Sequence, residues 1–183
     1  TEHFNNKRVI VTRKLDGENF TGYNDYCHAR SIDSKNHYTR NWAKKYWSER
    51  SYLLASDERI CAENLYAVHS IRYNNLPSYL IGFSFWTDDI CESWDNTVLN
   101  FQILNMPVVP VLYDGIFNEQ LIKDLHTAKD DLIHEGYVVR LADSFKYKDF
   151  NKSVAKYVRK NHVQSQQHWF YGKNNHEVNE CMK

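Results

Sequence analysis

Lys14 ends a short run of β-branched residues and stands two residues before an Asp-Gly pair, Asp16 and Gly17. Asp-Gly is a turn signal, so the pattern predicts a lysine held in one direction at the end of a strand. An amine fixed in this way could act as a nucleophile if nearby cations or burial favour its neutral form. A surface lysine beside a hairpin turn would give the same pattern, so these residues alone do not decide the chemistry.

A second group of charged residues lies far along the chain. Glu135 directly precedes an apolar run, Gly136–Leu141, that is typical of a buried strand. Residues 144–148 favour another strand, in which Lys146 and Lys148 are two positions apart and would share one face. Two ammonium groups on one face repel each other unless an anion such as a triphosphate lies between them. A solvated edge strand is the alternative interpretation of this pair.

Other polar clusters favour structural interpretations. The nine histidines form neither an H-x-x-x-H nor an H-E-x-x-H pattern, and no two of the four cysteines form C-x-x-C, so a zinc site is not expected. The cysteine spacing is not that of a disulfide scaffold, which predicts reduced thiols in a cytosolic protein. Asp88-Asp89 and Asp130-Asp131 stand beside loop signals, which favours solvated turns over acid–base catalysis.

Five segments, in order, resemble the motifs of the covalent nucleotidyltransferases, which comprise ATP-dependent ligases and mRNA capping enzymes. Together they span residues 12–148. They contain Lys14 (KLDGEN), Glu63 (AENLY), Phe83 (GFSF), Glu135 (EGYVV) and the pair Lys146 and Lys148 (KYK). The sequence is most similar to RNA ligases that resemble the phage nick-sealing enzyme. Two positions depart from the family pattern, with Ala62 where glycine is common and Ser84 where aspartate is usual.

The resemblance implies how these residues would handle ATP. Lys14 would form the covalent lysyl–AMP intermediate, and Phe83 would stack on the adenine. Glu63 would bind the ribose hydroxyls. Glu135 would hold a divalent metal, Mg²⁺ or Mn²⁺, directly or through water, because carboxylate oxygens suit hard cations.

The resemblance also implies several phosphate contacts. Lys146 and Lys148 would contact the phosphates of ATP and neutralise the leaving pyrophosphate. Asn19, five residues after the lysine, would touch the α-phosphate or a metal-bound water. Arg30 would bind the phosphate of AMP or of the nucleic-acid end.

The implied function is an ATP-dependent RNA ligase, whose partners are ATP and RNA, possibly DNA, ends with a 5′-phosphate and a 3′-hydroxyl. An end-healing enzyme could work with it. A DNA ligase or a capping-type guanylyltransferase is the alternative within the same chemistry. Two further alternatives do not join or cap nucleic acid. They are a non-catalytic nucleic-acid-binding module of the same fold and a protein AMP-transferase. Labelling with GTP or ATP would separate capping from ligation.

The composition agrees with a globular enzyme. The chain has 183 residues, 42% hydrophobic residues and a formal net charge of zero, which argues against a general basic coat for nucleic acid. No run of about 18 apolar residues occurs, so no membrane contact is expected, and a cytoplasmic location follows.

The order of predicted elements favours an α+β fold with mostly antiparallel sheets. We expect strands at 8–13, 19–23, 26–30, 59–66, 80–86, 108–113, 136–141 and 144–148, and helices at 40–54, 96–104, 118–128 and 151–162. Pro110 predicts an edge position for its strand. Residues 1–148 would form the adenylation domain, and 149–183 a short basic helical extension packed on it.

Two questions about the C-terminal part follow from its composition. Only 35 residues follow Lys148, too few for the oligonucleotide-binding barrel of DNA ligases and capping enzymes. The charges of the expected helix at 151–162 could lie along phosphates or remain solvated, and the pattern does not decide between these. The last dozen residues are expected to be loosely held.

Overall fold

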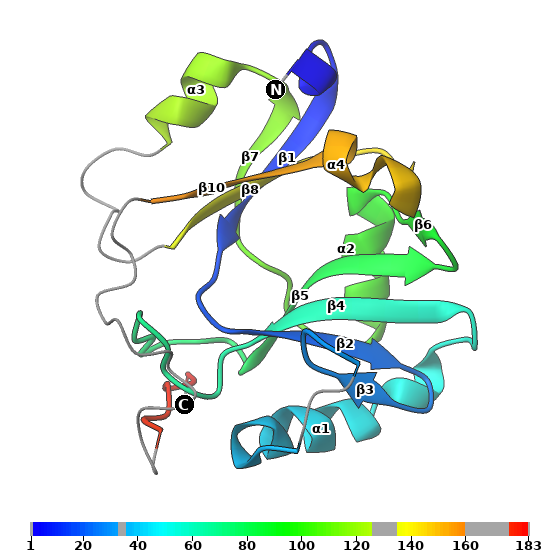
Figure 1. Cartoon of the computed structure of the whole chain (residues 1–183), viewed down its shortest axis with the longest axis vertical. Helices are drawn as coiled ribbons and strands as arrows, with labels where there is room; N and C mark the ends of the chain where they lie inside the picture. The colour runs from blue at the N-terminus through cyan, green and yellow to red at the C-terminus, as the bar shows by residue number, and fades with distance from the viewer. Residues whose placement is uncertain (1, 33–35, 126–134, 160–175, 183) are drawn as a thin grey trace.

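In the computed structural model, which describes residues 2–32, 36–125, 135–159 and 176–182, the chain forms two antiparallel sheets (Figure 1). One has four strands in the order β10-β8-β1-β7, and the other has six in the order β3-β2-β4-β5-β6-β9. Neither sheet closes into a barrel among the described residues. The prediction of an α+β fold with antiparallel sheets is therefore confirmed.

Within the described ranges, the strands are short and four α-helices accompany them. The strands are β1 Arg8–Lys14, β2 Glu18–Tyr23, β3 Cys27–His28, β4 Glu58–Asn64, β5 Leu80–Thr87, β6 Ile90–Cys91, β7 Val111–Ile116, β8 Gly136–Leu141, β9 Phe145–Lys146 and β10 Val154–Val158. The α-helices are α1 Asn41–Ser48, α2 Trp94–Ile103, α3 Glu119–Asp124 and α4 Phe150–Ser153. Single 3₁₀ turns are formed by Glu2–Phe4, Tyr38–Arg40, Ser51–Leu53 and Tyr147–Asp149.

Strand β1 is buried on both faces, which explains its unbroken run of β-branched residues. Ile10 belongs to the apolar cluster between the two sheets, together with Leu65 and Ile81 of the six-stranded side. Val9 and Val11 face the other way, into a cluster that includes Ile122 of α3. Residues that alternate along a strand project to opposite faces, so β1 links both layers of the core.

The far side of the six-stranded sheet is covered by α1 and α2. Phe20 of β2, Trp47 of α1 and Phe101 of α2 meet in one buried cluster. The helix predicted over 40–54 ends at Ser48 and is followed by a 3₁₀ turn. The helix predicted over 96–104 begins two residues earlier, at Trp94, behind the cap of Ser93.

Strand β7 and helix α3 follow one another at the edge of the four-stranded sheet. The edge position predicted from Pro110 is confirmed, although β7 begins only at Val111. Asn118 caps α3 as predicted, since its side-chain oxygen accepts the amide N–H of Leu121 at 3.0 Å. The remainder of the helix predicted over 118–128 lies outside the described residues.

Two predictions for the C-terminal third are wrong. The strand expected over 144–148 is only Phe145–Lys146, because its partner β6 has two residues and the chain then enters a 3₁₀ turn. The helix expected over 151–162 is a single turn, α4, followed by strand β10. β10 pairs with the edge of β8. These interstrand hydrogen bonds outweigh a local pattern that fits either structure.

The last described segment, residues 176–182, is held firmly, so the expectation of a loose end is wrong for this part. Asn179 is 1% exposed. Its side-chain oxygen accepts the N–H of Tyr73 at 2.8 Å, and its amide donates to the carbonyl of Leu65 at 2.7 Å. Because buried amides need such partners, Asn179 helps to fasten the segment to the loop after β4, together with backbone hydrogen bonds such as that from the N–H of Leu76 to the carbonyl of Glu180.

Candidate active site

The pairing of β1 with β8 brings Lys14 beside Glu135. Lys14 stands opposite Gly136 in the antiparallel register, so the preceding Glu135 lies next to the lysine. The Nζ atom of Lys14 donates to Oε2 of Glu135 at 2.5 Å. The side chains of Lys14 and Glu135 are 25% and 12% exposed, which leaves the amine within reach of a ligand.

Gly136 permits this arrangement. Its φ of 155° is a conformation that side-chain-bearing residues rarely adopt. A Cβ atom at this position would lie 2.0 Å from the backbone oxygen of Tyr157 in β10. The motif glycine therefore lets β8 and β10 approach while the chain turns Glu135 toward Lys14.

Glu63 faces the same place from the other sheet. It stands opposite Asn19 in the β2–β4 register, so both side chains project from one face of the six-stranded sheet. The Glu63 carboxylate accepts the N–H of Gly17 at 3.1 Å. Gly17 approaches so closely that a Cβ atom would lie 2.6 Å from the backbone oxygen of Asn64. Glycine therefore allows the N–H to reach the carboxylate.

The surroundings of Glu63 disfavour its charged form. The pKa of Glu63 is raised to about 8, chiefly because the carboxyl is buried and in smaller part because Glu135 and Asp16 place negative charge near it. The cation of Lys14 and the N–H of Gly17 act in the opposite direction. Burial is therefore the main reason that Glu63 favours its neutral form.

Asp16 fixes the turn that carries Lys14. It is 8% exposed, and its Oδ2 accepts the N–H groups of Ser70 and Ile71 at 2.7 and 2.8 Å. Its own N–H donates to the Tyr73 hydroxyl at 2.9 Å. These contacts bear out the expectation that Asp16 shapes the turn, and they connect it to the loop that Asn179 holds.

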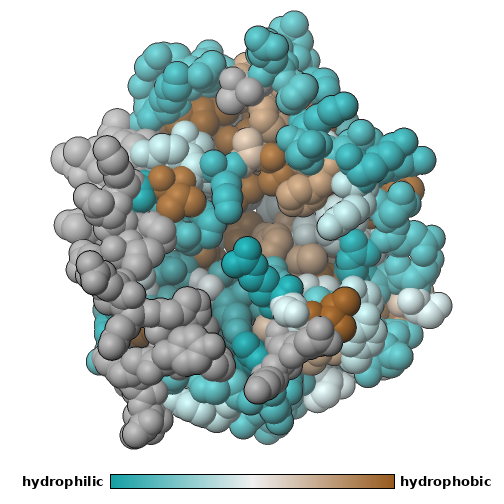
Figure 2. All heavy atoms as spheres, viewed as in Figure 1, coloured by the Kyte–Doolittle hydropathy of each residue, from teal (hydrophilic) through white to brown (hydrophobic). Residues whose placement is uncertain are grey.

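Phe83 lies in an irregular part of β5. Cys61 pairs with Ser84 and Ala62 with Gly82, so Phe83 is the extra residue of a β-bulge. Its partly buried ring packs against the cluster between the sheets that includes Leu15. Figure 2 shows a hollow at the centre of this face of the molecule, with hydrophobic residues inside it and hydrophilic residues around its rim.

The remaining predicted residues make no hydrogen bond or ion pair to this cluster in the part of the chain that the structure describes. Lys146 and Lys148 are exposed, one in β9 at the edge of the six-stranded sheet and the other in the following 3₁₀ turn. They do not share a strand face as expected, and no described hydrogen bond or ion pair joins either to Lys14. Arg30 is exposed in the loop after β3.

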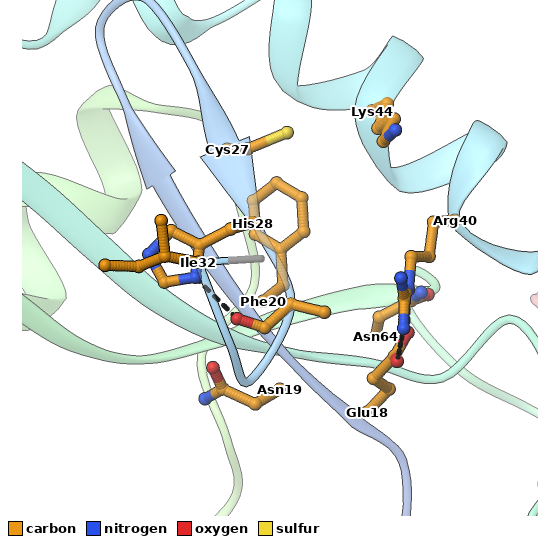
Figure 3. Close-up of a pocket in the computed structure, with 10 residues that line it drawn as sticks. Glu18, Asn19, Phe20, Cys27, His28, Ile32, Arg40, Lys44 and Asn64 are labelled. Carbon is orange, nitrogen blue, oxygen red and sulfur yellow. Dashed lines mark hydrogen bonds and ion pairs between the residues drawn. The ribbon is translucent and has the colours of Figure 1, made fainter. Parts of the chain in front are cut away.

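A small pocket beside β2 and α1 is distinct from the cluster around Lys14 (Figure 3). Within it, the guanidinium of Arg40 donates through Nε to Glu18 at 2.8 Å. Glu18 and Phe20 alternate with Asn19 along β2, so they face α1 and not Glu63. Asn19 contributes to the lining, but Lys14, Glu63 and Glu135 do not.

The pairing of β10 with β8 places a further lysine near the site. Val11, Val139 and Ala155 stand side by side and share the cluster on the α3 face. The neighbouring row, formed by Thr12, Val138 and Lys156, must project from the opposite face, on which Lys14 also lies.

Lys156 is exposed and lies two rows along the sheet from Lys14, which stands in the row of Gly136 and Val158. The sequence placed Lys156 on a helix expected over 151–162, whose charges could lie along phosphates or remain solvated. It did not predict the position of Lys156 beside β8, because Val154, Tyr157 and Val158 also fit one face of a helix.

The carboxylates of Glu135 and Glu63 suit a divalent cation. Oxygen donors are the preferred ligands of Mg²⁺ and Mn²⁺, and a cation here would offset the charge that raises the pKa of Glu63. No group of three or more His, Cys, Asp or Glu side chains with metal-binding geometry occurs within the described part of the chain. Water and phosphate oxygens would therefore have to complete the coordination.

Solved structures of ligases share this fold. A Naegleria gruberi RNA ligase with PPi has a TM-score of 0.58 at 21% identity, covering 79% of this chain and 50% of its own. A variant of that ligase with AMP and Mn has a TM-score of 0.59 at 18% identity, covering 86% and 51%. An Aquifex aeolicus protein described as an ATP-dependent DNA ligase has a TM-score of 0.56 at 20% identity, covering 86% and 45%.

The two facing antiparallel sheets, with Lys14, Glu63 and Glu135 where they meet, have the fold of a ligase-type nucleotidyltransferase domain. The chain belongs to the RNA ligase family, whose model matches residues 7–158. It spans about half the length of the solved RNA ligases that it matches. No curated protein sequence matches it.

Proposed function

We propose that this protein is an ATP-dependent RNA ligase that forms a lysyl–AMP intermediate on Lys14. The observation that carries the proposal is the contact between Lys14 and Glu135 at 2.5 Å, facing Glu63 across the junction of the sheets. The Nζ atom would attack the α-phosphorus of ATP, and the bond to pyrophosphate would break. The ammonium must first lose a proton, and the Glu135 carboxylate lies within hydrogen-bond distance to receive it.

The nucleoside would lie across the six-stranded sheet. Phe83 offers an apolar ring for the adenine beside the cluster between the sheets. Glu63 would accept hydrogen bonds from the ribose hydroxyls, and Asn19, its neighbour on β2, would reach the α-phosphate. These positions place the α-phosphorus near Lys14, so that alignment supplies much of the rate enhancement.

Several cations would neutralise the phosphates. Lys146 and Lys148 are proposed from the family motif, and Lys156 from its position on the same sheet face as Lys14. Arg30 would bind the phosphate of AMP or of the nucleic-acid end. A divalent metal, Mg²⁺ or Mn²⁺, would be held by Glu135 and would supply charge neutralisation at the phosphates when bound.

In the later steps, AMP would move from Lys14 to a 5′-phosphate end, and a 3′-hydroxyl would then displace AMP and join the strands. Residues 1–148, joined by Lys156 of β10, would carry the adenylation chemistry, with 149–183 packed on the same domain. No helix in the described part of the chain is long and apolar enough to cross a membrane.

Sealing of a matched panel of substrates tests the proposal. The panel contains 5′-phosphate RNA and DNA, each as a nick in a duplex and as a single strand, with ATP and either metal. We expect sealed RNA with the unaltered chain and none with Lys14→Ala. Sealing of DNA alone would favour the DNA ligase alternative, which the Aquifex aeolicus match also raises. Labelling by GTP instead of ATP would favour capping.

A further inference from the structure

Three aromatic rings gather on the hairpin that joins β2 and β3. The rings of Tyr23 and Tyr26 are stacked, with centroids 4.2 Å apart and planes inclined by 8°. The His28 ring lies close to both, at centroid distances of 5.8 and 6.2 Å. Tyr26 is 49% exposed, so this group, the aromatic hairpin face, presents ring surface to solvent.

The strand register puts the aromatic hairpin face on the same side of the sheet as the candidate active site. Asn19, Thr21 and Tyr23 alternate along β2 and therefore share one face. Thr21 pairs with His28, and the N–H of Tyr23 donates to the carbonyl of Tyr26 at 2.8 Å. Four residues of strand separate Tyr23 from Asn19, a distance of about 13 Å. A strand of a few nucleotides would span it.

The neighbouring strand carries a cation on the same face of the sheet. Arg59 of β4 stands opposite Tyr23. Its guanidinium lies 4.6 Å from the centroid of the Trp86 ring and donates to the carbonyl of Asp88 at 2.6 Å. These contacts hold the guanidinium toward β5, on the same sheet face as the tyrosine stack. Exposed aromatic rings alternating with fixed cations are the features that bind single-stranded nucleic acid, whose bases stack while its phosphates pair with the cations.

We propose that the aromatic hairpin face binds an unpaired base of the nucleic-acid strand whose 5′-phosphate lies at Lys14. The base stacks on Tyr26, and Arg59 pairs with an adjacent phosphate. This inference rests on the proposed ligase function and adds to it a preference for an unpaired nucleotide near the joining end. A cross-strand tyrosine pair that only stabilises the hairpin is the alternative that the test must separate.

The test compares four forms of the full chain: wild type, Tyr26→Ala, Tyr26→Trp and Tyr52→Ala. Tyr52 is a matched control because it is 76% exposed and lies in the 3₁₀ turn Ser51–Leu53, away from the hairpin. Binding is measured by fluorescence anisotropy with a labelled single-stranded 5′-phosphate RNA and with a fully paired duplex nick. Lysyl–AMP formation is measured in parallel with α-labelled ATP.

We expect Tyr26→Ala to weaken binding of the single strand about 5- to 150-fold, the range for loss of one base–aromatic stack. Tyr26→Trp should restore it, Tyr52→Ala should match the wild type, and lysyl–AMP formation should be unchanged in all. Equal weakening for the duplex nick, or wild-type binding by Tyr26→Ala, would overturn the inference. Failure of the wild type to form lysyl–AMP would instead count against the proposed function, while the binding comparison would still decide the inference.

Discussion

At the scale of single residues, the site is defined by an excess of carboxylates around one lysine. Lys14 contacts Glu135, and Glu63 and Asp16 lie near enough to influence each other's charge. The motif resemblance predicted Lys14, Glu63 and Glu135 as a group, and the strand register brings them together. The sequence did not predict that Lys156 lies on the same sheet face as Lys14, because its position depends on the pairing of β10 with β8.

The raised pKa of Glu63 makes stability depend on pH. Between the ordinary value of 4.5 and about 8, the folded protein keeps a proton on Glu63 that the unfolded chain has released. The contribution of Glu63 to the free energy of unfolding should therefore fall as pH rises through this window. Glu63→Gln should remove the effect, so its Tm relative to wild type should increase from pH 5 to pH 8.

Thermal unfolding in metal-free buffer at several pH values measures this difference. Glu2→Gln serves as a control, since Glu2 is exposed and lies in the first 3₁₀ turn. A Tm difference between Glu63→Gln and wild type that stays constant from pH 5 to pH 8 would show that Glu63 titrates in the same range in both states.

Replacement of Lys156 tests its place beside the phosphates. Loss of one group that stabilises developing charge slows catalysis about 100-fold or more, so Lys156→Ala should slow labelling of Lys14 by α-labelled ATP by that order. Lys146→Ala and Lys148→Ala are measured beside it. If only Lys156→Ala slows labelling, the phosphate contact belongs to Lys156 of β10 and not to Lys146 or Lys148. Unchanged labelling in Lys156→Ala would remove this residue from the site.

At the scale of elements, two tight approaches position Lys14 and Glu135. Gly136 lets β10 lie against β8, and Asp16 ties the β1–β2 connection to the loop after β4. The turn at Asp16-Gly17 was predictable from the residues themselves. The strand conformation of residues 154–158 was not predictable, because Val154, Tyr157 and Val158 also fit one face of a helix. Pairing with the edge of β8 is what makes this segment a strand.

Gly136→Ala should disrupt the junction of β8 and β10. The new Cβ would meet a backbone oxygen at 2.0 Å in a conformation unfavourable to alanine, so we expect a loss of about 1–3 kcal/mol in the free energy of unfolding. Urea denaturation measures it. Gly115→Ala is the matched control, because its Cβ would meet only the movable Tyr113 side chain. Equal stability of the two variants would contradict the role given to Gly136.

Asn179→Ala tests whether the C-terminal segment supports the loop that holds Asp16. The change leaves the N–H of Tyr73 and the carbonyl of Leu65 without their partner, at a cost of about 1–3 kcal/mol per buried group. Urea denaturation should show this loss, whereas Glu180→Ala, at an exposed neighbouring position, should match the wild type. Comparable stability of both variants would mean that the segment does not brace the loop.

At the scale of the whole molecule, two sheets meet at one end and leave a hollow between them (Figures 1 and 2). The fold class followed from the alternation of short apolar runs with turn signals. The split into two sheets did not, because strands β1 and β2 are separated by three residues yet belong to different sheets. That separation places Lys14 on one sheet and Glu63 and Phe83 on the other.

The central claim is that Lys14 becomes covalently attached to AMP. Incubation of the full chain with α-labelled ATP and Mg²⁺ or Mn²⁺, followed by denaturing electrophoresis, measures this directly. We predict a labelled wild-type band that pyrophosphate discharges, and no label on Lys14→Ala, which should remain folded because Lys14 is partly exposed at a strand end. A labelled Lys14→Ala protein, or an unlabelled wild type under both metals, would contradict the account.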